Sequence, residues 1–229
     1  MPPNMDGQIS SLDQQANQRA YAHWIARAVR RGSSDVPLRI LELGSDCGWL
    51  LRELMQTLPG RIGRFAAVEP NQDVVVQLKA AIAATNAPAH HFATLEAALQ
   101  HEGDGLDLVI AIHVLDHLFE LNELFATLRS RLSRQGMIFM VVHHPGSLLA
   151  RVLGKRWPPY CPQHPQLFTP KGVRCLARRH GMAVVNHGRT WNRFPLAMIL
   201  NHFSIPAGAL GSIPLLAPLG NRYYILKAQ

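Results

Sequence analysis

Hydrophobic residues in this chain form short runs, and stretches with helical spacing separate the runs. The apolar runs cover residues 38–43, 65–68, 106–112 and 136–142, and 89–92 is a further short segment of the same kind. Runs of this length are typical of strands that are buried on both faces of a sheet. After the first run, apolar residues recur with the period of a helix, at Leu50, Leu51, Leu54 and Leu58. Strands that alternate with helices predict an α/β fold with a parallel sheet.

The pattern continues toward both ends of the chain. Residues 182–185 begin a sixth predicted strand, and residues 221–227 form a last one. Before the first strand, apolar residues at helical spacing precede Gly32, where the helix is expected to end. We therefore predict an N-terminal helical cap at 1–34 and one α/β domain at 35–229.

Two stretches of the predicted domain are too long to be plain connectors. Residues 144–168 are rich in proline, histidine and aromatic side chains, and residues 191–220 are mostly apolar but interrupted by proline and glycine. Long segments inside a compact domain are usually functional. A membrane-spanning helix needs about 20 uninterrupted apolar residues. We therefore expect 191–220 to be a lid or pocket wall over an apolar substrate, or the interface of a homodimer.

The end of the first strand carries a turn that suits a nucleotide-like ligand. Gly44 and Gly48 let the backbone turn sharply after Glu42, and a helix follows at once. The second strand ends in Glu69, which is placed to accept hydrogen bonds from ribose hydroxyls. Two acidic residues at strand tips fit S-adenosylmethionine (SAM), which is cationic, better than a dinucleotide, whose pyrophosphate they would repel.

Four segments resemble class I SAM-dependent methyltransferases. Residues 42–48 resemble motif I of that family, and Val68-Glu69-Pro70 resembles its acidic ribose-binding motif. Residues 107–118 are similar to its fourth-strand signature, and the tract 145–170 resembles the small-molecule branch that is grouped with ubiquinone-pathway methyltransferases. Asp46 departs from the family, which usually has glycine at that position.

The resemblance implies a Rossmann-like, doubly wound, three-layer αβα fold. Its sheet would have seven mostly parallel strands, with the last strand antiparallel. SAM would be the cofactor and S-adenosylhomocysteine (SAH) the product. The N-terminal helix would lie over the cofactor pocket. The cofactor-binding positions that the resemblance implies are Glu42, Gly44, Ser45, Asp46, Gly48, Glu69, Pro70, Thr94, Leu95, Ile112 and His113.

Four histidines are candidates for a general base, because histidine titrates near neutral pH. They are His113, His143, His144 and His164, and we favour His143 and His144 slightly because they follow the fifth strand directly. Each has a structural alternative, which is to hold a loop by hydrogen bonds. We predict no metal site, because the His113–His117 spacing straddles a strand end and Cys161–His164 lacks a second pair of ligands.

Charge and cysteine content narrow the choice of partners. The 229-residue chain carries a formal net charge of +8, but its basic residues are spread over several segments without an RNA-binding module. We therefore disfavour nucleic acid and expect attraction to anionic substrates or peripheral contact with a membrane surface. Three scattered cysteines and a polar N-terminus without a signal-peptide pattern predict a cytoplasmic protein.

The leading functional hypothesis is O-methylation of a hydrophobic small molecule. The acceptor would be the phenol or enol of a quinone precursor or a polyketide-type natural product. One alternative is an RNA methyltransferase. Another is a SAM-binding protein that catalyses a reaction other than methyl transfer or acts as a regulatory subunit, and Asp46 in the glycine turn keeps this alternative open.

Overall fold

The computed structural model describes residues 11–31, 36–196, 200, 213–218 and 220–229. Its first half contains α1 (Ser11–Arg31), β1 (Leu38–Leu43), α2 (Trp49–Thr57), β2 (Ile62–Val68), α3 (Gln72–Ala83), β3 (Ala89–Phe92), α4 (Leu95–Glu102) and β4 (Leu106–Ile112). The second half contains the 3₁₀ turn η2 (Leu115–His117), α5 (Leu121–Arg131), β5 (Leu132–His143), α6 (Leu148–Leu153), η3 (Gly154–Arg156), α7 (Pro170–Arg179), β6 (Met182–Arg189), β7 (Asn192–Pro195), β8 (Pro214–Ala217) and β9 (Asn221–Ala228).

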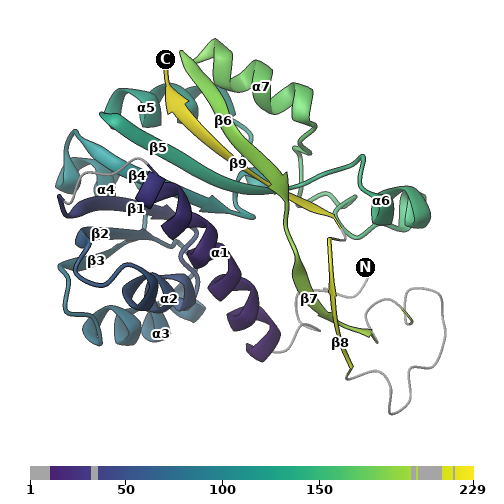
Figure 1. Cartoon of the computed structure of the whole chain (residues 1–229), viewed down its shortest axis with the longest axis horizontal. Helices are drawn as coiled ribbons and strands as arrows, with labels where there is room; N and C mark the ends of the chain where they lie inside the picture. The colour runs from purple at the N-terminus through teal and green to yellow at the C-terminus, as the bar shows by residue number, and fades with distance from the viewer. Residues whose placement is uncertain (1–10, 32–35, 197–199, 201–212, 219) are drawn as a thin grey trace.

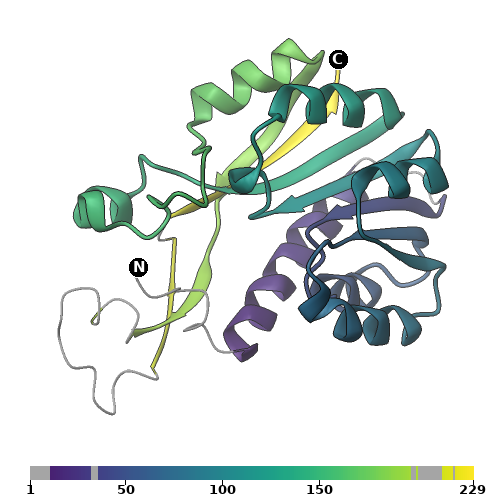
Figure 2. The same ribbon diagram turned by 180° about the vertical axis from the view of Figure 1, so that it is seen from behind.

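The main sheet has seven strands in the order β3-β2-β1-β4-β5-β9-β6 (Figure 1). Neighbouring strands from β3 to β5 are parallel, and β9 runs antiparallel to both β5 and β6. Helices cover both faces, as the two opposite views show (Figures 1 and 2). The prediction of a Rossmann-like, mostly parallel seven-stranded sheet with an antiparallel last strand is therefore confirmed.

Two hydrophobic clusters hold the three layers together. On one face, Tyr21 and Ile25 of α1 pack with Leu51 of α2 and Leu78 of α3. On the other face, residues of α4, α5 and α7 pack against the sheet, with Phe125 fully buried among them. Both faces of the central strands are therefore covered, which is why these strands appear in the sequence as continuous apolar runs.

Side-chain caps fix where several helices begin. The Asn71 side chain accepts a hydrogen bond from the Asp73 amide, and the Thr169 hydroxyl accepts one from the Gly172 amide, with Pro170 in the first turn of α7. Ser147 caps α6 in the same way. These caps satisfy amide groups that would otherwise lack partners.

The segment 191–220 includes a feature that the sequence pattern did not predict. Its described residues form β7 and β8, which pair antiparallel in a small second sheet with Asn192 opposite Ala217. This hairpin-like pair lies beside α1 and away from the main sheet (Figure 1). The rest of the predicted lid or interface lies outside the described residues.

The five parallel strands, β1 to β5, deliver their carboxyl ends to one edge of the sheet. The chain proceeds from β1 outward to β3 and then returns to β4 on the other side of β1. In open α/β sheets, ligands bind at such a reversal, beyond the carboxyl ends of the strands. The residues at the carboxyl ends of β1, β2, β4 and β5 are therefore the candidates for binding a ligand.

Gly48 offers a test of how tightly the first turn is packed. Gly48 has a φ of +76°, and a Cβ there would lie 2.8 Å from the Cβ of Ala81. Gly48→Ala is expected to lower the free energy of unfolding by about 3 kcal/mol, from backbone strain and overpacking together. Gly60, with φ +70° and no atom near its would-be Cβ, is the matched control. Gly60→Ala should cost only about 1–2 kcal/mol. Equal losses in urea unfolding would contradict the packing argument.

Candidate active site

The turn after β1 is tied to the end of β2. The amides of Gly44 and Ser45 both donate to the Val68 carbonyl, at 2.9 and 3.2 Å. Asp46 has a φ of +46°, so it adopts the left-handed conformation that aspartate tolerates better than most residues. Its amide donates to Oε2 of Glu69 at 2.9 Å. The aspartate therefore fits the turn, although the family usually has glycine there.

Glu69 is buried at the tip of β2 and held by backbone groups. Its Oε2 accepts from the Asp46 amide, and its Oε1 accepts from the Asn71 amide at 2.8 Å. A carboxylate has about four acceptor positions. Two of them are filled here, so the group is fixed in place and still able to accept hydrogen bonds from two hydroxyls.

Glu42, at the end of β1, is buried and has an unused acceptor. Among the described residues, none hydrogen-bonds its buried Oε2. Burial raises the pKa of Glu42 to about 8, a hydrogen bond from Ser45 opposes that rise, and the negative charges of Asp46 and Glu69 add to it. A ligand that brings a positive charge or a donor to Oε2 would satisfy this carboxyl group.

The pKa of Glu42 predicts how stability changes with pH in the absence of ligand. The folded state keeps a proton on Glu42 up to a pH of about 8, whereas the unfolded chain releases it near 4.5. Because the folded state binds more protons between these values, the free energy of unfolding is expected to fall as pH rises, by up to about 1.4 kcal/mol per pH unit from this group.

Glu42→Gln should remove this contribution, so the variant should gain stability relative to wild type as pH rises from 5 to 8. Urea unfolding at several pH values would measure the gain. The exposed Glu120 is the control position, and Glu120→Gln should leave the slope unchanged. If the free energy of unfolding of Glu42→Gln changed with pH as steeply as that of wild type, Glu42 would not be the source of the pH dependence.

His113 follows β4 in a left-handed conformation, with φ +54°. Its Nε2 lies 3.3 Å from both the Tyr21 hydroxyl and Nδ2 of Asn221. Burial lowers its pKa well below the ordinary value, and the neighbouring His143 and His164 lower it further. His113 is therefore neutral near pH 7, with Nε2 as the acceptor for the Asn221 amide.

His143, at the end of β5, is paired with a fully buried carboxylate. Asp116 in η2 is 0 % exposed. Its Oδ2 lies 3.1 Å from Nδ1 of His143, and its Oδ1 lies 3.3 Å from the His143 amide nitrogen. The carboxylate fixes the proton of the ring on Nδ1, so Nε2 remains as the acceptor. This is how an aspartate orients a histidine for use as a general base.

The histidine rings gather around His143. Ring centroids of His113 and His164 lie 4.8 and 4.9 Å from that of His143, and the buried Trp157 ring stands edge-on at 6.3 Å. Nδ1 of His164 lies 3.0 Å from the Pro159 carbonyl oxygen, and burial lowers the pKa of His164. Three of the four predicted histidines therefore meet at one place.

The fourth histidine, His144, is engaged elsewhere. Its Nδ1 lies 3.2 Å from the Phe168 carbonyl oxygen. Partial burial lowers its pKa, and the nearby cations of Arg222, Arg189 and Arg151 lower it further, against the opposing effect of the Phe168 bond. This contact holds the end of the loop before α7, which is the structural alternative that the sequence left open.

The remaining predicted cofactor positions take ordinary places near the strand ends. Thr94 caps α4 through its hydroxyl, and Leu95 and Ile112 pack against the two core clusters. The Ser45 hydroxyl lies 3.4 Å from the Glu42 carbonyl oxygen, while Pro70 is exposed. No distance in the structure assigns these residues to a ligand, so their roles stay predictions.

Sequence reasoning missed a network from distant segments. The Asn192 amide donates to the Tyr21 hydroxyl, and the Thr190 hydroxyl donates to Oδ1 of Asn192. Tyr21 in turn reaches His113, so α1 and β7 both support the histidine cluster. Nothing in the local pattern around Asn192 marks its contact with Tyr21, and nothing around Asn221 marks its contact with His113.

The ligand atoms of His113, Asp116 and His143 lie within 4.8 Å of one another. Histidine and carboxylate at this spacing would also suit a divalent cation. The prediction of no metal therefore remains a prediction, and a chelator belongs in any test of the histidines.

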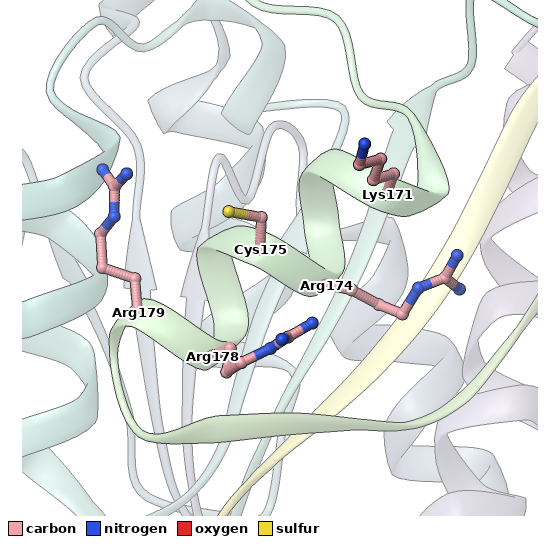
Figure 3. A pocket seen from close by; sticks show the side chains of 5 residues that line it. All are labelled: Lys171, Arg174, Cys175, Arg178 and Arg179. Atoms are coloured by element: carbon pink, nitrogen blue, oxygen red, sulfur yellow. The ribbon is translucent and has the colours of Figure 1, made fainter.

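The described residues also include an open pocket on the surface of α7. Lys171, Arg174, Cys175, Arg178 and Arg179 line it, and all five come from this one helix (Figure 3). The pocket contains none of the residues at the strand ends. We therefore place the candidate active site at the strand ends, where buried polar groups converge.

The sequence model of a methyltransferase domain matches residues 14–187, which is most of the chain and includes the turn, Glu69 and the histidine cluster. The chain belongs to this methyltransferase domain family. Membership confirms the predicted class of enzyme and, at the level of the family, SAM as the cofactor. No curated protein matches the sequence.

Solved structures of methyltransferases share the fold of this methyltransferase at low sequence identity. Magnesium protoporphyrin IX methyltransferase from Synechocystis PCC 6803, solved with bound SAH, is 16% identical, with a TM-score of 0.63 over 97% of this chain and 89% of its own. A SAM-dependent methyltransferase from Mesorhizobium loti is 17% identical, with a TM-score of 0.56 over 90% and 97%. A putative sarcosine dimethylglycine methyltransferase from Galdieria sulphuraria is 12% identical, with a TM-score of 0.61 over 90% and 84%.

At the strand ends of this methyltransferase, two carboxyl groups have acceptor positions that we expect SAM to use. Glu69 has acceptor positions for two ribose hydroxyls. The unpartnered Oε2 of Glu42 can accept a hydrogen bond from the ammonium group of the methionine part. The assignment of Glu69 to the ribose and of Glu42 to the methionine part stays a prediction.

No helix in the described ranges combines the length and the apolar character needed to span a membrane.

Proposed function

We propose that this methyltransferase methylates an oxygen of a hydrophobic small molecule, with His143 as the general base. The pairing of His143 with the buried Asp116 carries the proposal. Among the four candidate histidines, only His143 is bonded to a side-chain carboxylate. This arrangement leaves Nε2 ready to take a proton, and it stabilises the cation that results.

The residues have distinct tasks in this proposal. SAM supplies an electrophilic methyl group on a sulfonium. Glu69 would hold the ribose and Glu42 would receive the ammonium group, so these two residues would orient the cofactor. His143 Nε2 would take the proton of the phenol or enol as its oxygen bonds to the methyl carbon, and the electron pair of the broken carbon–sulfur bond would stay on sulfur. Asp116 keeps Nδ1 protonated and balances the charge on the ring.

The surroundings of His143 support an apolar acceptor. The buried Trp157 ring lies beside the His143 ring, and so does the neutral His113 ring. Planar aromatic groups pack well against such rings. The Synechocystis relative acts, by its name, on a porphyrin, which is consistent with a large planar acceptor.

Incubation of the protein with SAM and a panel of phenols and enols, followed by measurement of SAH, would test the proposal. Methylation at oxygen that depends on His143 would support it. Methylation at carbon or nitrogen only would contradict it. SAM binding without SAH release from any acceptor would favour the alternative of a SAM-binding protein with another reaction or a regulatory role.

The basic side chains of α7 favour RNA as a second candidate substrate. Lys171, Arg174 and Arg178 follow one another at helical spacing and are exposed. An RNA substrate would bind with an affinity that falls steeply with salt, and Arg174→Glu with Arg178→Glu would weaken that binding. Salt-insensitive methylation of a small phenol would decide against it.

A further inference from the structure

We propose that α6 and the 3₁₀ turn η3 form a peripheral membrane-binding site for anionic lipid. The site, called here the α6 patch, consists of Leu148, Arg151, Val152, Lys155 and Arg156. It concerns binding alone and does not depend on which acceptor the enzyme methylates.

Two apolar side chains of α6 face solvent. Leu148 is 71 % exposed and Val152 is 61 % exposed. They are four positions apart in one helix, so they lie on the same face. Within α6, Ala150 is buried and Leu149 and Leu153 are half-buried, so Leu148 and Val152 are the large apolar side chains of this helix that the rest of the protein leaves exposed. Exposed apolar residues that cluster in this way mark surfaces that bind something.

Basic side chains flank these two residues. Arg151 lies between them in sequence, and Lys155 and Arg156 follow in η3; all three are exposed. The described part of this segment, 147–157, contains no acidic residue. Apolar residues that insert below lipid headgroups, with cations at headgroup level, are the pattern of an interfacial helix. A protein partner would not need this combination, whereas an anionic bilayer matches both halves of it.

The shape of the molecule leaves the patch accessible. In both views α6 stands clear of the sheet, beyond the carboxyl ends of its strands (Figures 1 and 2). Tyr160, which is 47 % exposed, follows the patch and packs its ring against Trp157 at 5.0 Å. Tyrosine is favoured at the boundary between water and lipid. The Trp157 ring also contacts the His143 ring, with centroids 6.3 Å apart, so a bilayer at α6 would lie close to the candidate base.

Co-sedimentation of the full chain with lipid vesicles tests the proposal. We expect the protein to bind vesicles that contain phosphatidylcholine and phosphatidylglycerol. Its binding to pure phosphatidylcholine should be weaker by on the order of 10²-fold, since each basic residue contributes about fivefold. Leu148→Asp with Val152→Asp should lower the partition coefficient on anionic vesicles at least about tenfold. Lys155→Glu with Arg156→Glu should lower it by about 10²-fold or more.

Two matched double variants serve as controls. Val36 and Val76 are 64 % and 77 % exposed and lie outside the patch, so Val36→Asp with Val76→Asp should leave vesicle binding unchanged. Arg174→Glu with Arg178→Glu on α7 is the control for charge and should reduce binding far less than the η3 pair. Equal losses in the control and patch variants would overturn the assignment to α6.

Two other results would also overturn it. One is the absence of co-sedimentation with anionic vesicles at low salt. The other is a change from dimer to monomer on Leu148→Asp with Val152→Asp in sedimentation equilibrium without lipid, which would show that a second copy of the chain covers the patch. Thermal unfolding of every variant would show that the fold is intact.

Discussion

Replacing Asp116 with asparagine is expected to lower kcat by about 10²- to 10⁴-fold, with little change in SAM affinity. The carboxylate of Asp116 accepts from Nδ1 of His143 and so leaves Nε2 free for the substrate proton. An asparagine amide would fit the same space, but its NH₂ group would favour the opposite tautomer, with the proton on Nε2. The base would then be blocked although every cofactor contact remained.

The pH dependence separates this role from a purely structural one. His143→Gln should remove the acidic limb of the kcat profile, because that limb reports protonation of the base. His113→Gln should leave the limb in place, since the pKa of His113 is already held well below its ordinary value by burial and by neighbouring histidines. A variant that only disturbed the fold would lower activity at all pH values equally.

Asp107 provides a control for the Asp116 substitution. It lies at the start of β4, where Oδ1 accepts from the Ser133 hydroxyl and Oδ2 accepts from the Arg39 amide. Asp107→Asn therefore loses comparable hydrogen bonds at the opposite end of the strand and should cost stability but not kcat. Equal kcat losses in the two variants would refute a role for Asp116 in proton transfer.

Treatment with a chelator distinguishes a free base at His143 from a metal site. If EDTA abolished activity and a divalent cation restored it, His113, Asp116 and His143 would act as metal ligands. The proposed role of His143 as a free base would then be wrong.

Glu69→Ala is expected to weaken SAM binding by about 10²- to 10⁴-fold. Two hydrogen bonds from hydroxyls to a charged acceptor contribute roughly 1.5–3 kcal/mol each. Part of the loss would come from the turn, because Glu69 also holds the Asp46 amide. Calorimetric titration with SAM and with SAH would measure the change. Unchanged affinity would exclude Glu69 from the cofactor site.

A double-mutant cycle separates two contributions of Glu69 to SAM affinity, its contact with the ribose and its hydrogen bond to the Asp46 amide in the turn. The second change is made in the ligand, by using SAH that lacks one ribose hydroxyl. Wild-type protein should bind the deoxy ligand about tenfold or more weakly than SAH, whereas Glu69→Ala should bind the two alike. A variant that still distinguished the two ligands fully would show that another group recognises the ribose.

The central strands could be read from the sequence with little error. Residues 38–43, 89–92 and 106–112 are strands at the predicted positions. In β1 and β4 the reason is burial on both faces, which leaves a continuous apolar run. At the other edge of the sheet the sequence predicted correctly where β6 begins but not where it ends. β6 continues to Arg189 because exposed and covered positions alternate along it, a pattern that an apolar run does not reveal.

Short elements outside the core were missed for a related reason. α6 has only six residues, which is too short for helical periodicity to distinguish it from a loop. β7 and β8 exist because Asn192 pairs with Ala217 across a long intervening segment. Local periodicity carries no information about such a distant partner.

The pattern of strands along the chain is enough to predict that Gly44, Glu69, His113 and His143 meet at one edge of the sheet. They lie at the ends of buried strands, and the carboxyl ends of parallel strands lie together. Which of the four histidines has a carboxylate partner depends on the three-dimensional packing. The pairing of His143 with Asp116 depends on the register between β4 and β5, and the contact of Tyr21 with His113 joins residues 92 positions apart. Such distances follow from how strands and helices pack, which no local pattern of residues encodes.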